Sequence, residues 1–321
     1  MSDRYRLITR SDFDGLVCAV LLRKLELIDE ISFAHPKDVQ DGKVEITDRD
    51  ILTNLPYQPQ AHQVFDHHLS EERRNADGSA ATGGRARNHV LVADAPSAAR
   101  VVYDHFGGAA TFPDVSPTMM AAVDQADAAQ YDLDDILQPA GWALLNFIMD
   151  PRTGLGRFRE FRISNYQLMM QLIDYCADHD DIDDVLAIPD VAERVALFQE
   201  QRPAFVDQLH RVTTLHGDLA KIDLRPEETI HAGNRFMVYA LFPQARVSMH
   251  VMWGREKQNI VFAAGKSILD RSSGVDLGAV MLGHGGGGHQ AAGTCQVPIE
   301  AADDVMSRLI EQLSTEHDAL V

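Results

Sequence analysis

The sequence predicts an α/β protein with a mainly parallel sheet flanked by helices, followed by a smaller C-terminal α/β domain. Short apolar runs alternate with helical segments through the first half of the chain, and alternating units of this kind form parallel sheets covered on both faces. In the last third the hydrophobic period changes to two residues, as in strands with one buried face. The 321 residues are enough for two domains.

The first half provides the elements of the parallel sheet. The run DGLVCAVLLRKLELI is apolar on most sides, so we expect a largely buried helix there. In such sheets, ligands bind at the carboxyl ends of the strands. The expected strands lie at 4–9, 30–35, 43–47 and 62–65, and the expected helices at 14–28, 97–106 and 117–131.

The second half begins with a helical region at 141–177. The acidic run at 178–184 is expected to be a solvated loop. Apolar residues recur at helical spacing over 191–212, and this spacing is interrupted beside Pro203. The pattern predicts a kinked linker helix. The segments 235–242, 246–254 and 259–265 read as strands, followed by a glycine-rich loop and a final helix. The expected domains are therefore 1–185 and 216–321, with a linker helix at 186–215.

Composition limits the class of protein. The net charge of −19 disfavours binding of long nucleic acid, which depends on neutralising phosphates. The charged N-terminal stretch is unlike a signal peptide, and no apolar run is long enough to cross a bilayer. Three widely separated cysteines, Cys18, Cys176 and Cys295, favour reduced thiols. We therefore expect a cytoplasmic protein that does not bind membranes.

Four clusters of acidic residues and histidines fall at the ends of predicted elements. Asp12 and Asp14 alternate in extended chain, so both can face one cation. Carboxylates with imidazole suit manganese or magnesium, and two such ions about 3.5–4 Å apart can clamp a phosphoryl group. Each cluster is weak evidence alone, but the set of four indicates a metal site. The clusters are SDFDG at 11–15, TDRD at 47–50, DHH at 66–68 and VDQAD at 123–127.

A glycine-rich motif, GHGGGGHQAAGT, lies at 283–294. Its consecutive glycines can turn backbone N–H groups toward an anion, because no side chains intervene. His289 can add a further donor. The motif therefore indicates an anion-binding loop in the second domain.

These motifs together resemble the DHH phosphoesterase superfamily, including its DHH-associated C-terminal domain. The stretches DILTNLPY, NFIMDPRTGLGRF and GKSILDRSSGVDLG are similar to the exopolyphosphatase-related, nanoRNase-like branch. The resemblance covers essentially the whole chain. It implies a manganese-dependent phosphohydrolase, with one or two ions and with magnesium or cobalt as alternatives, whose substrate binds in a cleft between the two domains.

The resemblance also implies roles for individual residues in the first two motifs. Asp12 and Asp14 match the metal ligands of the first motif. In the second motif Asp50 is the preferred bridging ligand and Asp48 the alternative. Many relatives have a histidine two residues before the first aspartate, where this chain has Arg10. A guanidinium cannot bind a metal, so either one ion has a ligand fewer or Arg10 contacts phosphate.

For the third and fourth motifs, the resemblance makes Asp66 an orienting residue or metal contact. His67 is expected to bind metal and His68 to contact the substrate phosphate. Asp127 is the preferred fourth ligand, with Asp124 as the alternative. In the C-terminal domain the expected substrate-binding groups are Arg271, the backbone of Gly286, Gly287 and Gly288, and His289.

The expected function is metal-dependent hydrolysis of small phosphodiesters, such as short oligonucleotides and linear or cyclic dinucleotides. Removal of a terminal phosphate from polyphosphate or from a nucleotide bisphosphate is an alternative enzyme activity. A catalytically weakened nucleotide sensor is an alternative of another class, because Arg10 replaces a ligand. The expected partner is a small phosphorylated substrate, and the family resemblance allows a homodimer.

Overall fold

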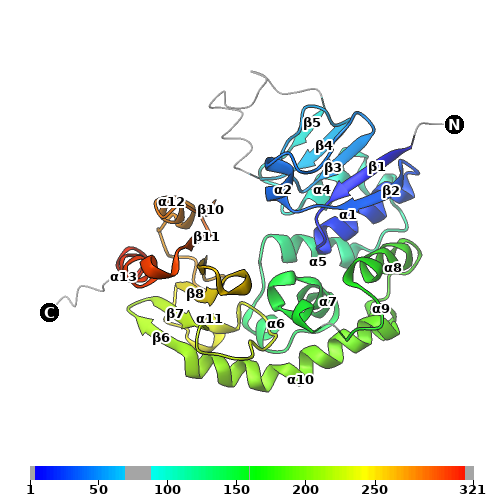
Figure 1. The fold of residues 1–321 in the computed structure, drawn as a ribbon. Coiled ribbons are helices and arrows are strands. Elements are labelled where there is room, and N and C mark those ends of the chain that lie inside the picture. The colour runs from blue at the N-terminus through cyan, green and yellow to red at the C-terminus, as the bar shows by residue number, and fades with distance from the viewer. Residues whose placement is uncertain (1–3, 69–87, 159, 315–321) are drawn as a thin grey trace. The chain divides into compact units, whose positions relative to one another are not determined.

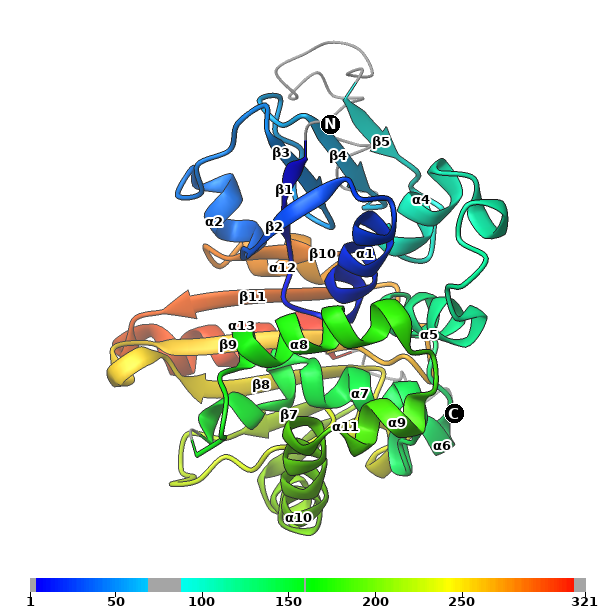
Figure 2. The ribbon, with the colours of Figure 1, turned by 90° about the vertical axis from the view of Figure 1, so that its right-hand side faces the viewer.

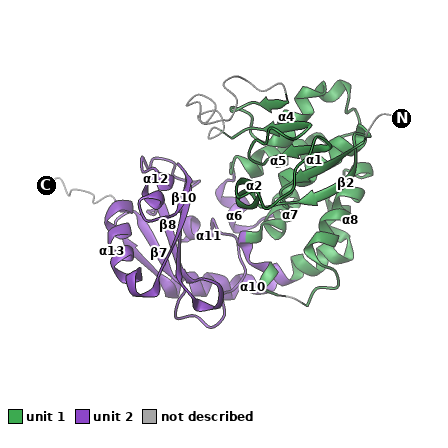
Figure 3. Ribbon diagram, turned by 45° about the horizontal axis from the view of Figure 1, so that its top comes forward, with its two compact units in different colours: residues 1–130, 140–151, 156–196 green, residues 131–139, 152–155, 197–321 purple. Residues whose placement is uncertain are grey.

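A computed structural model describes residues 4–68, 88–158 and 160–314 (Figure 1). The chain forms two compact units, coloured separately in Figure 3. Two short segments from the first half belong to unit 2, and the main passage between the units falls inside one helix. The domain limits at 185 and 215 stay a prediction. Unit 1 comprises Met1–Gln130, Ala140–Pro151 and Gly156–Ala196, and unit 2 comprises Tyr131–Pro139, Arg152–Leu155 and Leu197–Val321.

Unit 1 contains a five-stranded sheet in which all strands are parallel, so the predicted parallel α/β architecture is confirmed. Leu7 and Ile8 are both fully buried although they point to opposite faces, as expected when helices cover both sides. In sheet order, the strands are β2 (Ile28–Phe33), β1 (Tyr5–Thr9), β3 (Asp50–Thr53), β4 (Gln63–Asp66) and β5 (His89–Leu91).

Some of the helices of unit 1 cover the two faces of this sheet. On one face, Ile8, Leu52 and Val64 form a core with Val39. On the other, the ring of Phe65 lies 5.2 Å from that of His105 in an edge-on contact. The helices are α1 (Phe13–Lys24), α2 (Pro36–Gln40), α4 (Ala98–His105), α5 (Pro117–Asp127), α7 (Gly141–Met149), α8 (Asn165–Asp178), α9 (Ile182–Ala187) and the first part of α10 (Pro189–Val212).

Helices α9 and α10 differ in detail from the expected loop and linker. Asp181 caps α9, since its side chain accepts a hydrogen bond from the backbone N–H of Asp183. The acidic run therefore provides the start of a helix, where carboxylates are favourable. Helix α10 continues through Pro203 over 24 residues.

Two predicted strands are wrong. Residues 43–47 form an irregular segment before β3, and Val44 and Ile46 pack on the core from there. Residues 237–241 form a helix, α11, in which Met237, Val238 and Tyr239 are all buried. A short helix buried on every side shows no 3.6-residue period, so its sequence cannot be told from that of a strand.

Unit 2 is built on a six-stranded mixed sheet, in which only β7 and β8 run parallel. Figure 2 shows β11, β9, β8 and β7 side by side. In sheet order, the strands are β10 (Gly287–His289), β11 (Ala292–Val297), β9 (Ile260–Lys266), β8 (Val247–Trp253), β7 (Leu219–Asp223) and β6 (Thr213–His216); the helices are α6 (Leu133–Leu137), α11 (Met237–Leu241), α12 (Leu277–Leu282) and α13 (Ala302–Leu313).

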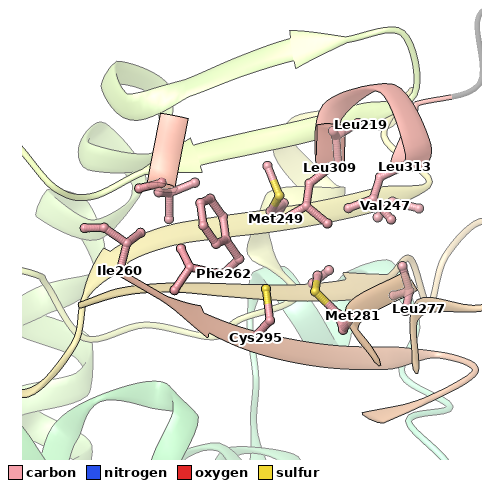
Figure 4. Close-up of a cluster of buried hydrophobic side chains, with 14 residues drawn as sticks. Leu219, Val247, Met249, Ile260, Phe262, Leu277, Met281, Cys295, Leu309 and Leu313 are labelled. Atoms are coloured by element: carbon pink, nitrogen blue, oxygen red, sulfur yellow. The ribbon is translucent and has the colours of Figure 1, made fainter. Parts of the chain in front are cut away.

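One face of this second sheet carries the core of unit 2 (Figure 4). Val247, Met249 and Val251 alternate along β8 and are fully buried, as their two-residue spacing predicted. Leu309 and Leu313 of α13 pack on the same cluster. None of the helices in the described parts of the chain has the length and hydrophobicity of a membrane span.

Candidate metal centre

The candidate site lies where the parallel strands of unit 1 end. Strand β1 ends at Thr9, and α1 begins only a few residues later, so the connection is tight. A Cβ atom on Gly15 would lie 2.0 Å from the carbonyl oxygen of Arg10, so only glycine allows this close approach. The tight turn brings the first residues of α1 to the carboxyl edge of the sheet.

Asp14 is held in the first turn of α1 and is 2% exposed. Its Oδ1 accepts a hydrogen bond from the N–H of Ala99 at 2.8 Å, and Oδ2 accepts from the N–H of Ala98 at 3.2 Å. These donors belong to the first turn of α4, where unpaired N–H groups favour an anion. The carboxyl group is therefore fixed in position from two helices.

Asp14, His67 and Asp127 can share one ion. Each offers a ligand atom, and these atoms lie within 4.8 Å of one another. His67 follows β4, and Asp127 is the last residue of α5, so three separate elements supply the group. Two carboxylates with an imidazole are a donor set that suits a divalent ion such as manganese, so the residues fit the implied metal.

The tautomer of His67 is set by the backbone. Its Nδ1 lies 3.0 Å from the carbonyl oxygen of Ala95, which can only accept, so we assign the proton to Nδ1. Nε2 then faces the other way and lies 2.9 Å from Oδ2 of Asp127. A second hydrogen bond of this kind is typical of metal-binding histidines, since it orients the ring and its free nitrogen.

The electrostatics of these three residues are strongly coupled through burial and mutual contact. The pKa of Asp14 is raised to about 8, first by burial and then by the nearby Asp127 carboxylate. Burial alone would lower the pKa of His67, but contact with Asp127 and the charge of Asp14 raise it to about 9. The same contact lowers the pKa of Asp127 in spite of its burial. A divalent ion would replace the protons that Asp14 and His67 retain.

The other residues of the first and third motifs surround this group. Asp12 caps α1 by accepting a hydrogen bond from the N–H of Gly15 at 3.0 Å, and its Oδ2 lies 3.0 Å from Nε of Arg10. The fully buried Asp66 holds His68, because its Oδ1 lies 2.7 Å from His68 Nδ1. The other oxygen of Asp66 has no hydrogen-bond partner among the described residues.

The residues expected from the second motif lie elsewhere. Asp50 is the first residue of β3, at the amino end of the sheet, and accepts two hydrogen bonds from Arg6, at 2.8 and 2.9 Å. Asp48 is exposed in the preceding turn. Neither position suits a residue that binds the same ion as Asp14, His67 and Asp127. The expectation is corrected for a physical reason: the strand lies at 50–53 rather than 43–47, so Asp50 begins a strand instead of following one.

The fourth-motif alternative, Asp124, also has a different role. It receives two hydrogen bonds from Arg100, at 3.0 and 2.6 Å, and one from the hydroxyl of Ser97 at 2.7 Å. Asp124 therefore ties α5 to the start of α4. Among the two fourth-motif candidates, the structure brings only Asp127 to the cluster.

Asn54 was missed by sequence reasoning. It is the residue that follows β3 at the carboxyl end, and it is 1% exposed. The signal for it is the run DILT, which contains the β-branched Ile51 and Thr53 and stands directly before a polar residue. Placing the strand there instead of at 43–47 would have identified Asn54.

Part of the glycine-rich segment of unit 2 forms a strand instead of the expected loop. Gly287 to His289 form the edge strand β10, paired antiparallel with β11. A Cβ atom on Gly286 would lie 2.0 Å from the carbonyl oxygen of Thr294, so close backbone packing requires glycine there. The N–H of Gly286 donates to Met281 O at 2.9 Å and is thus not available to an anion, which corrects the expectation for that residue. Arg271 and His289 are both exposed.

Comparisons with known proteins agree with the motifs. The chain is 56% identical to a pGpG-specific phosphodiesterase, PggH, from Vibrio cholerae, covering 97% of this chain and 99% of that one with a TM-score of 0.81. CDC45 from Entamoeba histolytica is 10% identical, covers 97% of this chain and 96% of its own, and has a TM-score of 0.50, which shows a shared fold. No family model matches the chain, and no curated protein matches it.

The 56% identity extends over nearly the full length of both chains. The Asp-His-His stretch ends a central parallel strand, and the first-motif aspartate and the fourth-motif aspartate converge on it. The chain belongs to the DHH phosphoesterase superfamily.

Proposed function

We propose that the protein is a manganese-dependent phosphodiesterase that hydrolyses a short linear dinucleotide, with pGpG as the first substrate to test. The observation that carries the proposal is the convergence of Asp14, His67 and Asp127 within 4.8 Å in a relative of a pGpG-specific phosphodiesterase. The specificity stated in that relative's name supports the choice of substrate.

The residues around the ion have separable roles. When bound, a divalent ion polarises the phosphoryl group and supplies a nucleophile at neutral pH. Asp14, His67 and Asp127 would hold it, with His67 oriented by the carbonyl of Ala95. We propose that Asp66 orients His68 and that His68 contacts the substrate phosphate. The 2.7 Å contact between Asp66 and His68 supports this, since a buried carboxylate fixes the ring and its tautomer.

Substrate binding by unit 2 is a further part of the proposal. Arg271 and His289 are exposed, and Gly287 and Gly288 lie in the edge strand β10. We propose that these residues bind the terminal nucleotide, because a cationic side chain and edge-strand N–H groups suit a phosphate. The acidic charge of the whole chain favours a small substrate over long nucleic acid.

The test is a turnover assay with products identified by mass. Purified protein, stripped of metal, is given pGpG, other linear dinucleotides, a cyclic dinucleotide, short polyphosphate and a nucleotide bisphosphate, each with manganese, magnesium or cobalt. We expect manganese-dependent conversion of pGpG to mononucleotide and loss of activity with EDTA. Preferred release of terminal phosphate would favour the exopolyphosphatase or bisphosphatase alternative. Binding of pGpG without turnover would favour a sensor.

A further inference from the structure

The side chains proposed to bind the terminal nucleotide lie at one end of the unit 2 sheet. His289 pairs with Ala292 across β10 and β11, and Ala292 pairs with Gly265 near the end of β9. Arg271 lies in the segment 267–273, which follows β9 directly. The conformation of this short segment therefore decides where the guanidinium of Arg271 is presented.

Ser267 fixes the first turn of this segment. It is 2% exposed, and its Oγ accepts hydrogen bonds from the N–H groups of Leu269 at 3.2 Å and Asp270 at 3.0 Å. Its own N–H donates to the carbonyl oxygen of Arg246 at 2.8 Å, which ties the segment to the residue before β8. A hydroxyl that accepts neighbouring N–H groups stabilises a turn. The backbone that leads to Arg271 is thus held by hydrogen bonds.

Both carboxylate oxygens of Asp270, the residue before Arg271, accept hydrogen bonds. Oδ1 accepts from the N–H of Ser272 at 3.0 Å and from its hydroxyl at 2.5 Å. Oδ2 accepts from Nε of Arg246 at 3.2 Å. These contacts, those of Ser272 first, lower the pKa of Asp270, so it is ionised at neutral pH. Asp270 therefore carries a negative charge directly beside a residue that is proposed to bind phosphate.

A carboxylate close in sequence can capture an arginine side chain in this protein. Nε of Arg225 donates to Oδ1 of Asp223 at 2.9 Å, and its Nη2 donates to Oδ2 at 2.7 Å. Such two-point pairs hold a guanidinium firmly and use its donors. Without its present partners, Asp270 would compete in the same way with phosphate for the guanidinium of Arg271.

Arg246 is placed to prevent this competition. Its Nε bonds to Asp270, while Nε of Arg271 donates to the carbonyl oxygen of Ile268 at 3.3 Å. Arg246 also lies 4.0 Å from a carboxylate oxygen of Asp218, so two carboxylates hold its charge in place. Its positive charge therefore offsets the negative charge of Asp270 at the end of the sheet where substrate is proposed to bind.

We propose that Arg246 is a positioning residue for substrate binding by unit 2. By pairing with Asp270, it keeps that carboxylate from capturing Arg271, so Arg271 can bind a phosphate of the dinucleotide. Arg246 itself does not touch the substrate. This inference rests on the proposed function, because it requires that Arg271 binds the substrate.

The experiment measures KM and kcat for pGpG with manganese in wild-type protein and in folded variants. Arg246→Gln should raise KM at least about tenfold, because Asp270 then takes the guanidinium of Arg271 as a charge-assisted partner. The rate on a small aryl phosphodiester, which has no second nucleotide, should be nearly unchanged. Adding Asp270→Asn to Arg246→Gln should bring KM back to within about threefold of the wild-type value, because a neutral amide competes weakly.

Two further variants test whether the effect is specific. Arg225→Gln is the matched control: it leaves Asp223 without this cation at the other end of the same sheet and should keep the wild-type KM. Arg271→Ala should raise KM by itself. Adding Arg246→Gln to it should then cause no further increase, since both changes act through one contact.

A wild-type KM in folded Arg246→Gln would overturn the proposal. A raised KM in the folded double variant with Asp270→Asn would also overturn it, because Arg246 would then bind substrate itself. If Arg246→Gln alone does not fold, the double variant decides, since Asp270→Asn removes the competing carboxylate.

Failure of the proposed function looks different, since wild-type protein would then not hydrolyse pGpG. If it still binds the dinucleotide, Kd takes the place of KM in the same comparison of variants, and the same outcomes decide the role of Arg246. Absence of both turnover and binding would overturn the two proposals together.

Discussion

The Nε2 atom of His67 lies 2.9 Å from Oδ2 of Asp127, in a site where the same nitrogen is expected to bind a metal. Without an ion, a proton on His67 balances the negative charge of Asp127. With an ion bound, that proton must leave, because a metal-bound imidazole nitrogen has no hydrogen. The contact therefore links metal binding to pH.

The first prediction concerns metal affinity as a function of pH. Asp14, with a pKa of about 8, and His67, with a pKa of about 9, must both lose protons to bind an ion. Manganese affinity should therefore rise by more than about tenfold between about pH 6 and pH 9. Titrations in buffers of different ionisation enthalpy should show proton release on binding. No proton release near neutral pH would contradict the assignment of these ligands.

The second prediction concerns the stability of the metal-free protein. Both pKa values are raised above their ordinary values of 3.8 and 6.5, so both groups bind protons more tightly when folded. Their stabilising contribution is complete below the unfolded values and is lost as pH rises through about 8 and 9. The melting temperature of the metal-free protein should fall from pH 6 to pH 9, while the increase caused by manganese grows. Asp14→Asn, which cannot titrate there, should reduce the pH dependence.

The sequence predicted the architecture because its signals are local. Alternating short apolar runs and helices indicate a parallel sheet, and polar residues at strand ends indicate a site. The prediction from sequence was wrong where two kinds of local structure share one hydrophobic pattern. Val44 and Ile46 alternate like strand residues but pack on the core from an irregular segment. The misplaced strand makes Asp50 an expected ligand, although Asp50 begins β3 and Asn54 is the residue that follows it. Long-range partners such as Ala95 for His67 have no local signal at all.

The third prediction separates the two aspartates of the fourth motif. Asp127→Asn should lower manganese affinity and reduce kcat/KM at least about 100-fold with little effect on folding, since it removes a ligand charge. Asp124→Asn should bind manganese normally but lose roughly 1–3 kcal/mol of stability, because Arg100 and Ser97 lose a charged partner. Urea denaturation and manganese titration on both variants give the comparison. The reverse outcome would make Asp124 the ligand.

The fourth prediction tests the structural role of Asp50. Its ion pair with Arg6 lowers the pKa of the carboxyl group despite burial. The stabilisation is therefore present above the usual carboxylate pKa and is lost as pH falls through the lowered value. Asp50→Asn should destabilise the protein by roughly 1–3 kcal/mol at neutral pH and should leave manganese stoichiometry and kcat of the folded protein unchanged. A loss of bound manganese in folded Asp50→Asn would restore Asp50 as a ligand.

The last prediction concerns unit 2, where substitutions at two nearby positions should reduce activity for different reasons. His289 is exposed, so His289→Ala should fold normally and retain its manganese. If His289 binds the far end of the substrate, this variant should raise KM for pGpG and lower kcat only as far as that binding aligns the phosphate. A small aryl phosphodiester, which offers no second nucleotide, should be hydrolysed at nearly the wild-type rate.

Gly286→Ala provides the contrast, because its added methyl group would collide with the carbonyl of Thr294. This variant should lower the melting temperature, and activity toward both substrates should fall in proportion to the unfolded fraction. Kinetics on both substrates, together with thermal melts, distinguish these two kinds of loss. Equal loss on both substrates in a fully folded His289→Ala variant would show that His289 takes part in the chemical step. Substrate binding by unit 2 would then have to depend on other residues.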